Sequence, residues 1–184
     1  MKRILLALCL AFIMVFALTG CGSENIENMY SFGTKVMTVG QSEVQVFLPY
    51  DIGQDVGLTA TPKGNPETVY GGNDKHFFVM VSAIQGTPQL PLPSIQDQSK
   101  DGMTYITSMQ RTTIQTQKNE MVSINGTPAL KTSGTMTLEN VSFSFYQYTF
   151  INKGVLWNIF YEYRTDDAVG AALAAKVVGH IQIT

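Results

Sequence analysis

The sequence predicts an α+β domain built on a mostly antiparallel β-sheet. Segments with the two-residue alternation of strands recur along the chain, and turns rich in Asn and Gly separate several of them. Only two segments have the spacing of amphipathic helices, one in the middle of the chain and one near its C-terminus. This arrangement is typical of a layered α+β domain, in which helices cover a sheet.

The clearest strands form a hairpin in the C-terminal third. Ser142 to Ile151 and Val155 to Tyr163 are joined at Asn152-Lys153-Gly154, a short turn that predicts antiparallel pairing. The alternation of the second strand predicts that Trp157 and its i±2 neighbours share one face, while Asn158, Glu162 and Arg164 share the other. We interpret Glu162 and Arg164 as a surface ion pair.

Weaker strand patterns occupy much of the remaining chain. Asn125-Gly126 is a strong turn dipeptide between two of them. Gly71 to Asp74 reads as a second hairpin turn with positive-φ positions. Residues 51–66 carry several Gly and Pro and are expected to form a loop. The remaining strands are expected at residues 43–48, 68–70, 77–84, 121–124, 129–138 and 180–183.

Capping residues predict where the two helices begin. Ser94, followed three residues later by Asp97, is an acidic variant of a capping box after a Pro-rich extended segment. Asp166 or Asp167 can cap a helix over residues 168–178, which Gly179 ends. The expected apolar faces comprise Ile95, Gly102, Ile106 and Met109 in the first helix and Val169, Ala172, Leu173 and Val177 in the second.

The N-terminus has the layout of an export signal. Lys2 and Arg3 precede an apolar run from Ile4 to Leu18, which is shorter than the ~20 residues of a membrane-spanning helix. The tetrad Leu18, Thr19, Gly20, Cys21 that follows resembles the lipobox of bacterial lipoproteins. The alternative is an ordinary secretory signal that has Cys21 next to it by chance.

The lipobox resemblance implies a membrane anchor and a compartment. Diacylglycerol on the sulfur of Cys21, with palmitate among the fatty acids attached, would hold the protein on the cell membrane or outer membrane, facing away from the cytoplasm. The predicted organisation is a signal peptide at 1–20, a lipidated N-terminus and flexible tether at 21–34, and one domain at 35–184. The only other cysteine, Cys9, lies in the signal, so no disulfide or Cys-ligated metal is expected in the mature domain.

Several sequence segments together resemble the Mog1/PsbP-like proteins. They are VQVFLP, INGTPALK, FSFYQYTFINKGVLWNIFYEY and the final helix followed by HIQI. The resemblance covers roughly residues 36–184 and implies a central antiparallel sheet flanked by helices, an α/β/α sandwich. It also implies an accessory or partner-binding role without shared catalytic residues, so it transfers no functional residue to this chain.

Tyrosines on the C-terminal hairpin are the candidate binding surface. Tyr146, Tyr148, Tyr161 and Tyr163 supply the side chains that dominate recognition hot spots, although cross-strand packing explains most of them better. The only histidines, His76 and His180, lack a second ligand at helical spacing. Asp74, two residues before His76, offers a weak divalent-ion site, for which a solvated turn is the favoured alternative. No metal or cofactor is therefore expected.

Three functions fit these patterns, and a non-enzymatic binding or assembly module outside the cytoplasm fits best. No phosphate-binding loop, nucleophile elbow or zinc-protease motif is present, and the few basic residues with a net charge of −2 argue against nucleic-acid binding. The predicted partners are the membrane, through Cys21, and an envelope protein. A carrier of a small apolar ligand held near Phe143, Phe145 and Trp157 is the second hypothesis. An enzyme of unrecognised type, whose carboxylates converge with His76 or His180 in a cleft, is the third.

Overall fold

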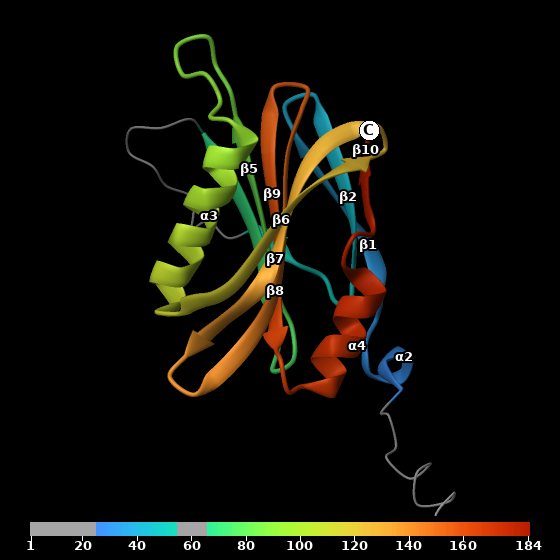
Figure 1. Ribbon diagram of the computed structural model, residues 1–184. Helices are drawn as coiled ribbons and strands as arrows, with labels where there is room; N and C mark the ends of the chain where they lie inside the picture. The colour runs from blue at the N-terminus through green and yellow to red at the C-terminus, as the bar shows by residue number, and fades with distance from the viewer. Residues whose placement is uncertain (1–24, 55–65) are drawn as a thin grey trace, which may run out of the picture.

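The computed structural model describes residues 25–54 and 66–184. The predicted signal peptide and the lipobox residues Leu18, Thr19, Gly20 and Cys21 therefore lie outside the described residues, as does most of the predicted loop at 51–66. The described chain forms a sheet-rich α+β body (Figure 1).

Ten strands and three helices make up the described part of the chain. The helices are α2 (Ile26–Met29), α3 (Ile95–Gln110) and α4 (Ala168–Val177). The strands are β1 (Gly33–Val39), β2 (Ser42–Leu48), β3 (Gly53–Gln54), β4 (Glu67–Asn73), β5 (Phe78–Gln85), β6 (Thr113–Ile124), β7 (Thr127–Leu138), β8 (Val141–Asn152), β9 (Val155–Arg164) and β10 (Ile181–Ile183).

The strands form two antiparallel sheets. The larger has seven strands in the order β3-β4-β5-β9-β8-β7-β6, and the smaller has three in the order β1-β2-β10. All the strand pairs described are antiparallel, as predicted. The C-terminal hairpin therefore occupies the centre of the larger sheet, with β5 on its other side.

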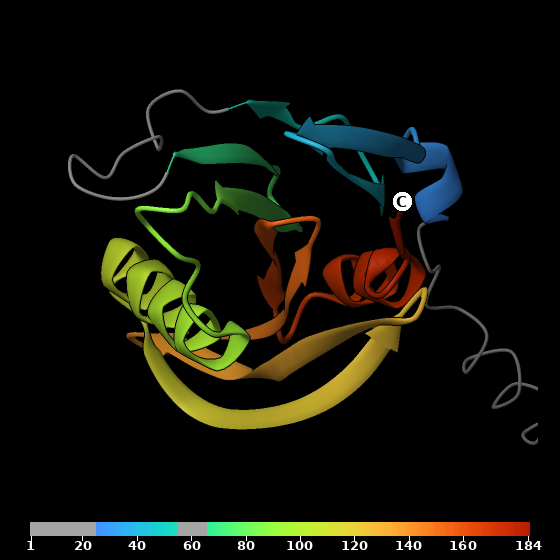
Figure 2. The ribbon, with the colours of Figure 1, turned by 90° about the horizontal axis from the view of Figure 1, so that it is seen from above.

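The covering of the larger sheet differs from the predicted helix-flanked sandwich. Helix α3 packs on one face, against β7, β8 and β9. The opposite face is covered by α4 together with the smaller sheet, so that α3 and α4 lie on opposite sides of β9 (Figure 2). The small sheet takes this place because every second residue of β2 is buried, which gives it an apolar inner face.

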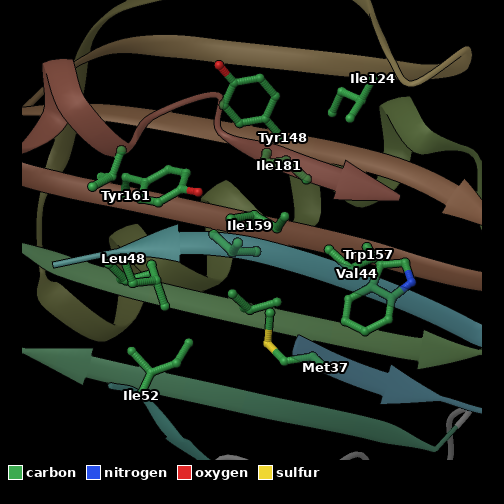
Figure 3. Packing of buried hydrophobic residues seen from close by; sticks show 14 of the residues in the cluster. Met37, Val44, Leu48, Ile52, Ile124, Tyr148, Trp157, Ile159, Tyr161 and Ile181 are labelled. Carbon is green, nitrogen blue, oxygen red and sulfur yellow. The ribbon is translucent and has the colours of Figure 1, made fainter. Parts of the chain in front are cut away.

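The main core lies between the two sheets. Met37, Val44 and Leu48 of the smaller sheet face Trp157, Ile159 and Tyr161 of β9 (Figure 3). Trp157 is fully buried, and its indole Nε1 donates a hydrogen bond to Ser42 Oγ at 2.8 Å. A second, smaller core lies under α3 and contains Met103, Ile106, Met136, Phe145 and Phe160.

Two predicted hairpin turns are confirmed. Asn125 and Gly126 between β6 and β7 have φ values of 49° and 86°, and Lys153 and Gly154 between β8 and β9 have 46° and 74°. Positive φ at both central residues is the requirement of a type I′ turn, whose twist matches that of the flanking strands. The local sequence therefore specifies the register of the central hairpin.

The turn between β4 and β5 lies later than predicted. Gly71 and Gly72 continue β4 with ordinary strand geometry, and the chain reverses after Asn73, where Asp74 Oδ1 accepts hydrogen bonds from the backbone N–H groups of His76 and Phe77. Gly72 serves close packing, since a Cβ there would lie 2.9 Å from the Ile52 side chain.

Both long helices begin at the predicted capping residues. Ser94 Oγ accepts from the N–H of Asp97 at 3.1 Å, and Asp167 Oδ1 accepts from the N–H of Val169 at 3.0 Å. The predicted apolar face of α3 is wrong at Met109, which is exposed. The buried face of α3 consists of Ser99, Gly102, Met103 and Ile106.

Part of the expected tether, residues 25–34, falls within the described residues. Asn25 caps α2, whose Glu27 pairs with Lys176 of α4. Strand β1 starts at Gly33, which is paired with Leu48. This polar segment thus contacts both α4 and β2.

Candidate functional site

A small pocket lies at the end of the larger sheet where β5 and β9 meet the β4–β5 turn. Its volume is about 250 Å³. It is named the His76 pocket below, and its lining comprises Asn73, Asp74, Lys75, His76, Phe77, Phe78, Gln110, Phe143, Glu162, Tyr163 and Arg164. The turn, the last residue of α3 and the ends of β8 and β9 thus contribute to one site.

His76 and Asp167 form a close pair at the N-terminus of α4. His76 Nδ1 lies 2.7 Å from Asp167 Oδ2, and both side chains are largely buried. Burial by itself raises the pKa of Asp167, but hydrogen bonds from His76 and from the backbone N–H groups of Gly170 and Val169 outweigh it and hold the pKa below its usual value. Asp167 is therefore an ionised acceptor, and it fixes the His76 proton on Nδ1.

Glu162 lies buried under the end of α3. Gln110 Nε2 donates to Glu162 Oε2 at 2.6 Å, and Glu162 is only 7% exposed. Burial raises the pKa of Glu162, and the hydrogen bond from Gln110 offsets part of this rise. The predicted surface ion pair between Glu162 and Arg164 is wrong, because Arg164 instead holds Asp166 through two hydrogen bonds.

Two buried polar atoms at the His76 pocket have no hydrogen-bond partner. They are His76 Nε2 and Gln110 Oε1, and Tyr161 OH is the only other such side-chain atom found in residues 25–54 and 66–184. Unsatisfied buried polar groups cost free energy and are uncommon in native proteins. Two of the three lie at one pocket, next to a buried carboxylate, and this makes the His76 pocket the candidate functional site.

Hydrogen bonds hold the turn that carries His76. The Tyr50 hydroxyl donates to the carbonyl of Phe77 at 2.6 Å, and the Tyr30 hydroxyl donates to Asp74 Oδ2 at 2.5 Å. Burial, followed by the negative charge of Asp74, raises the pKa of Tyr50, so this phenol stays a donor at neutral pH. The β4–β5 turn thus forms one wall of the pocket, and its residues Asn73, Asp74 and Lys75 are exposed, as expected for the solvated turn that the sequence favoured.

The tyrosines predicted as a binding surface do not form one exposed platform. Tyr161 is fully buried and Tyr148 is 6% exposed, whereas Tyr146 and Tyr163 are half-buried. Lys131 Nζ lies 5.8 Å from the Tyr146 ring centre and 5.9 Å from that of Tyr148. These side chains chiefly pack across strands, which is the alternative that the sequence favoured.

The other histidine, His180, lies at a larger and more open groove. This groove, of about 730 Å³, is lined by residues that include Thr34, Gln45, Phe47, Lys176 and His180. The His180 ring centre lies 6.1 Å from that of Phe47. His180 is exposed, and the lining that the described residues give this groove contains no carboxylate, so its polar chemistry is less specific than that of the His76 pocket.

The residues predicted to hold an apolar ligand fill the interior themselves. Phe145 and Trp157 are fully buried, the ring centres of Phe145 and Phe160 lie 6.1 Å apart, and Phe143 packs against the same cluster. This packing argues against an apolar carrier.

Within the described ranges, no group of three or more His, Cys, Asp or Glu side chains could hold a metal ion. No helix among those residues is long and apolar enough to cross a membrane.

Sequence reasoning missed the His76 pocket because its parts come from distant segments. His76 and Asp167 are 91 residues apart, and Gln110 and Glu162 are 52 apart. One signal was present: Glu162 shares a strand face with Asn158 and Phe160, in the strongest strand of the sequence. A carboxylate on such a face is buried once a helix covers it.

No known protein family matches the sequence, and no curated protein matches it. Among solved structures, the cyanobacterial PsbP (CyanoP) of Synechocystis sp. PCC 6803 has a TM-score of 0.56 at 14% identity, covering 90% of this chain and 98% of that one. The fold is PsbP-like. This confirms the PsbP-like fold that the sequence resemblance implied, although the body is sheet-rich and not the helix-flanked α/β/α sandwich.

Two further structures are more distant. A protein from Bacteroides thetaiotaomicron VPI-5482 has a TM-score of 0.43 at 10% identity; the match covers 77% of this chain but only 45% of that one. LpqN, involved in cell envelope biogenesis of Mycobacterium tuberculosis, has a TM-score of 0.42 at 12% identity, covering 85% of this chain and 94% of that one.

Proposed function

We propose that this protein is a lipid-anchored, extracytoplasmic binding module without enzymatic activity. The observation that carries the anchor is the tetrad Leu18-Thr19-Gly20-Cys21 directly after a short apolar run with a basic start. Diacylglycerol on Cys21 and a further acyl chain would together hold the protein firmly on a membrane. The PsbP-like fold is compatible with such an accessory role.

The position of the body supports a role close to the membrane surface. Asn25, which caps α2, follows Cys21 by four residues, and a fully extended chain spans at most ~3.6 Å per residue. The body would therefore lie within about 15 Å of the lipid anchor. An envelope protein that reaches the same membrane surface is the proposed partner class.

The His76 pocket supports binding in preference to nucleophilic catalysis. His76 is oriented by Asp167 as in hydrolase triads, but the described lining contributes no Ser, Thr or Cys side chain that His76 Nε2 could activate. What the pocket provides is a buried carboxylate and unpaired acceptors, and these hold a ligand without any bond being broken.

The anchor is tested by metabolic labelling with an alkyne analogue of palmitate in a bacterium that processes lipoproteins. We expect the label on the wild type and on Cys9→Ser, the matched control in the signal, but not on Cys21→Ser. Equal labelling of Cys21→Ser, or an unlabelled wild type, would contradict the proposal.

The binding role is tested with a panel of chromogenic ester, phosphate and glycoside substrates. Turnover that His76→Gln abolishes would contradict it.

A further inference from the structure

We infer that the His76 pocket binds a small organic cation that carries N–H donors, namely a primary alkylammonium or a guanidinium group. The inference rests on the proposed binding function and names the ligand chemistry of this site. It depends on which hydrogen-bonding groups of the pocket are donors and which are acceptors, and these assignments follow from the partners of each group.

The first assignment concerns Gln110. Gln110 Nε2 donates to Glu162 Oε2 at 2.6 Å, so the amide NH₂ of Gln110 faces the carboxyl group of Glu162. The amide oxygen then faces away from Glu162, and this Oε1 is the buried atom that lacks a partner. Gln110 therefore presents a free acceptor.

The second assignment concerns His76. Because Asp167 is an ionised acceptor, Nδ1 of His76 carries the proton of their 2.7 Å hydrogen bond. In the neutral imidazole the other nitrogen is then an acceptor. Nε2 is buried without a partner, so two unpaired atoms, His76 Nε2 and Gln110 Oε1, lie in the walls of the pocket beside the carboxylate of Glu162.

The buried charge of the pocket favours a cation. Asp74 and Glu162 are the carboxylates that line it, and Lys75 and Arg164 are the cationic side chains. Of these four, only Glu162 is buried; Lys75 is exposed, and Asp166 binds the guanidinium of Arg164. Burial strengthens the attraction between Glu162 and an entering cation, because the low local dielectric screens it less than water does.

The apolar part of the lining limits the size and shape of the ligand. Phe78 and Phe143 both line the pocket, and Phe78 is paired with Glu162 across β5 and β9. Aromatic faces attract ammonium and guanidinium groups and accommodate the attached methylenes. A volume of about 250 Å³ fits a cationic head with a short alkyl chain.

Nuclear magnetic resonance on the full chain, purified from membranes in mild detergent and labelled with ¹⁵N-histidine, tests the inference. The chain has only two histidines, so His180→Gln assigns the His76 ring signals. At pH 8 we expect n-butylammonium and methylguanidinium to shift the His76 Nε2 signal saturably and to leave His180 unchanged. Tetramethylammonium, which has the charge but no N–H donor, is expected to bind at least about tenfold more weakly.

Substitutions locate the binding group. We expect Glu162→Gln, which keeps the side-chain shape, to weaken n-butylammonium binding at least about tenfold, and Gln110→Met to weaken it severalfold. Glu120→Gln, which removes an exposed carboxylate on β6, is the matched control and is expected to change nothing. A blocked lysine dipeptide distinguishes two sources of the cation, a lysine side chain of a partner protein and a free small amine. If the dipeptide binds with an affinity like that of n-butylammonium, the source is a partner's side chain. If the dipeptide does not bind, the source is a free amine.

Three outcomes would overturn the inference. They are equal affinity for tetramethylammonium, unchanged affinity in Glu162→Gln, and a His76 signal that responds to Zn²⁺ but to neither organic cation. Each leaves the lipid anchor untouched, because acylation of Cys21 is measured separately.

Discussion

The substitution Gly170→Ala tests how α4 is seated against the His76 pocket. A Cβ at position 170 would lie 2.7 Å from the carbonyl oxygen of His76 and 2.8 Å from Tyr163 Cβ. Neither atom is the end of a flexible side chain, so α4 or the β4–β5 turn must shift. Overpacking of this kind costs about 1–3 kcal/mol, whereas Ala in place of Gly in a helix returns at most ~1 kcal/mol.

The expected net effect of Gly170→Ala is a loss of up to about 2 kcal/mol in the free energy of unfolding, after the gain in helix propensity is subtracted. For a domain of this size, that lowers the midpoint of thermal unfolding by up to about 8 °C. Urea titration followed by circular dichroism measures the free energy, and a thermal melt measures the midpoint. Ala171→Gly, at the next and exposed position of α4, is the control for helix propensity alone. A Gly170→Ala protein stabilised by about 1 kcal/mol, the full gain in helix propensity, would refute this placement of α4.

Three further predictions concern buried polar groups. Ser42→Ala leaves the indole N–H of Trp157 without its acceptor, so we expect urea titration to show a loss of about 1–3 kcal/mol. Asp167→Asn should destabilise the protein above pH ~4, because folding lowers the pKa of Asp167 and the ionised carboxylate stabilises the wild type. The difference in unfolding free energy between variant and wild type should shrink as the pH falls below ~4. Glu162→Gln should show the opposite pH dependence. Folding raises the pKa of Glu162, so ionising this carboxyl group destabilises the wild type. Thermal melts should therefore show the melting temperature of the variant rising relative to that of the wild type as the pH rises above ~4.5.

The parts of the fold that sequence predicts well are those set by local chemistry. Lys153-Gly154 and Asn125-Gly126 specify two-residue turns, and the alternation on either side then determines which faces are buried. Ser94 and Asp167 start their helices because each cap satisfies a backbone N–H group within its own turn. None of this requires knowledge of the rest of the chain.

The parts that sequence misses depend on contacts between distant segments. Strand β1 begins in a polar stretch that becomes a strand only through its pairing with β2. Glu162 looks like a surface residue until α3 covers it and Gln110 binds it. Met109 is exposed although Ile106, one turn earlier, is fully buried, because the face of α3 that meets the sheet runs through Ser99, Gly102, Met103 and Ile106. The His76 pocket is a product of these tertiary contacts, so local patterns do not reveal it.

The proposed location of this protein depends on Cys21 becoming the lipid-bearing N-terminus after export. Mass spectrometry of the N-terminal peptide, released from protein purified out of bacterial membranes, detects this modification. We expect a peptide that starts at Cys21 and whose mass includes diacylglycerol. A peptide with an unmodified Cys21 thiol, or one that begins at another residue, would show that the protein is not anchored in this way.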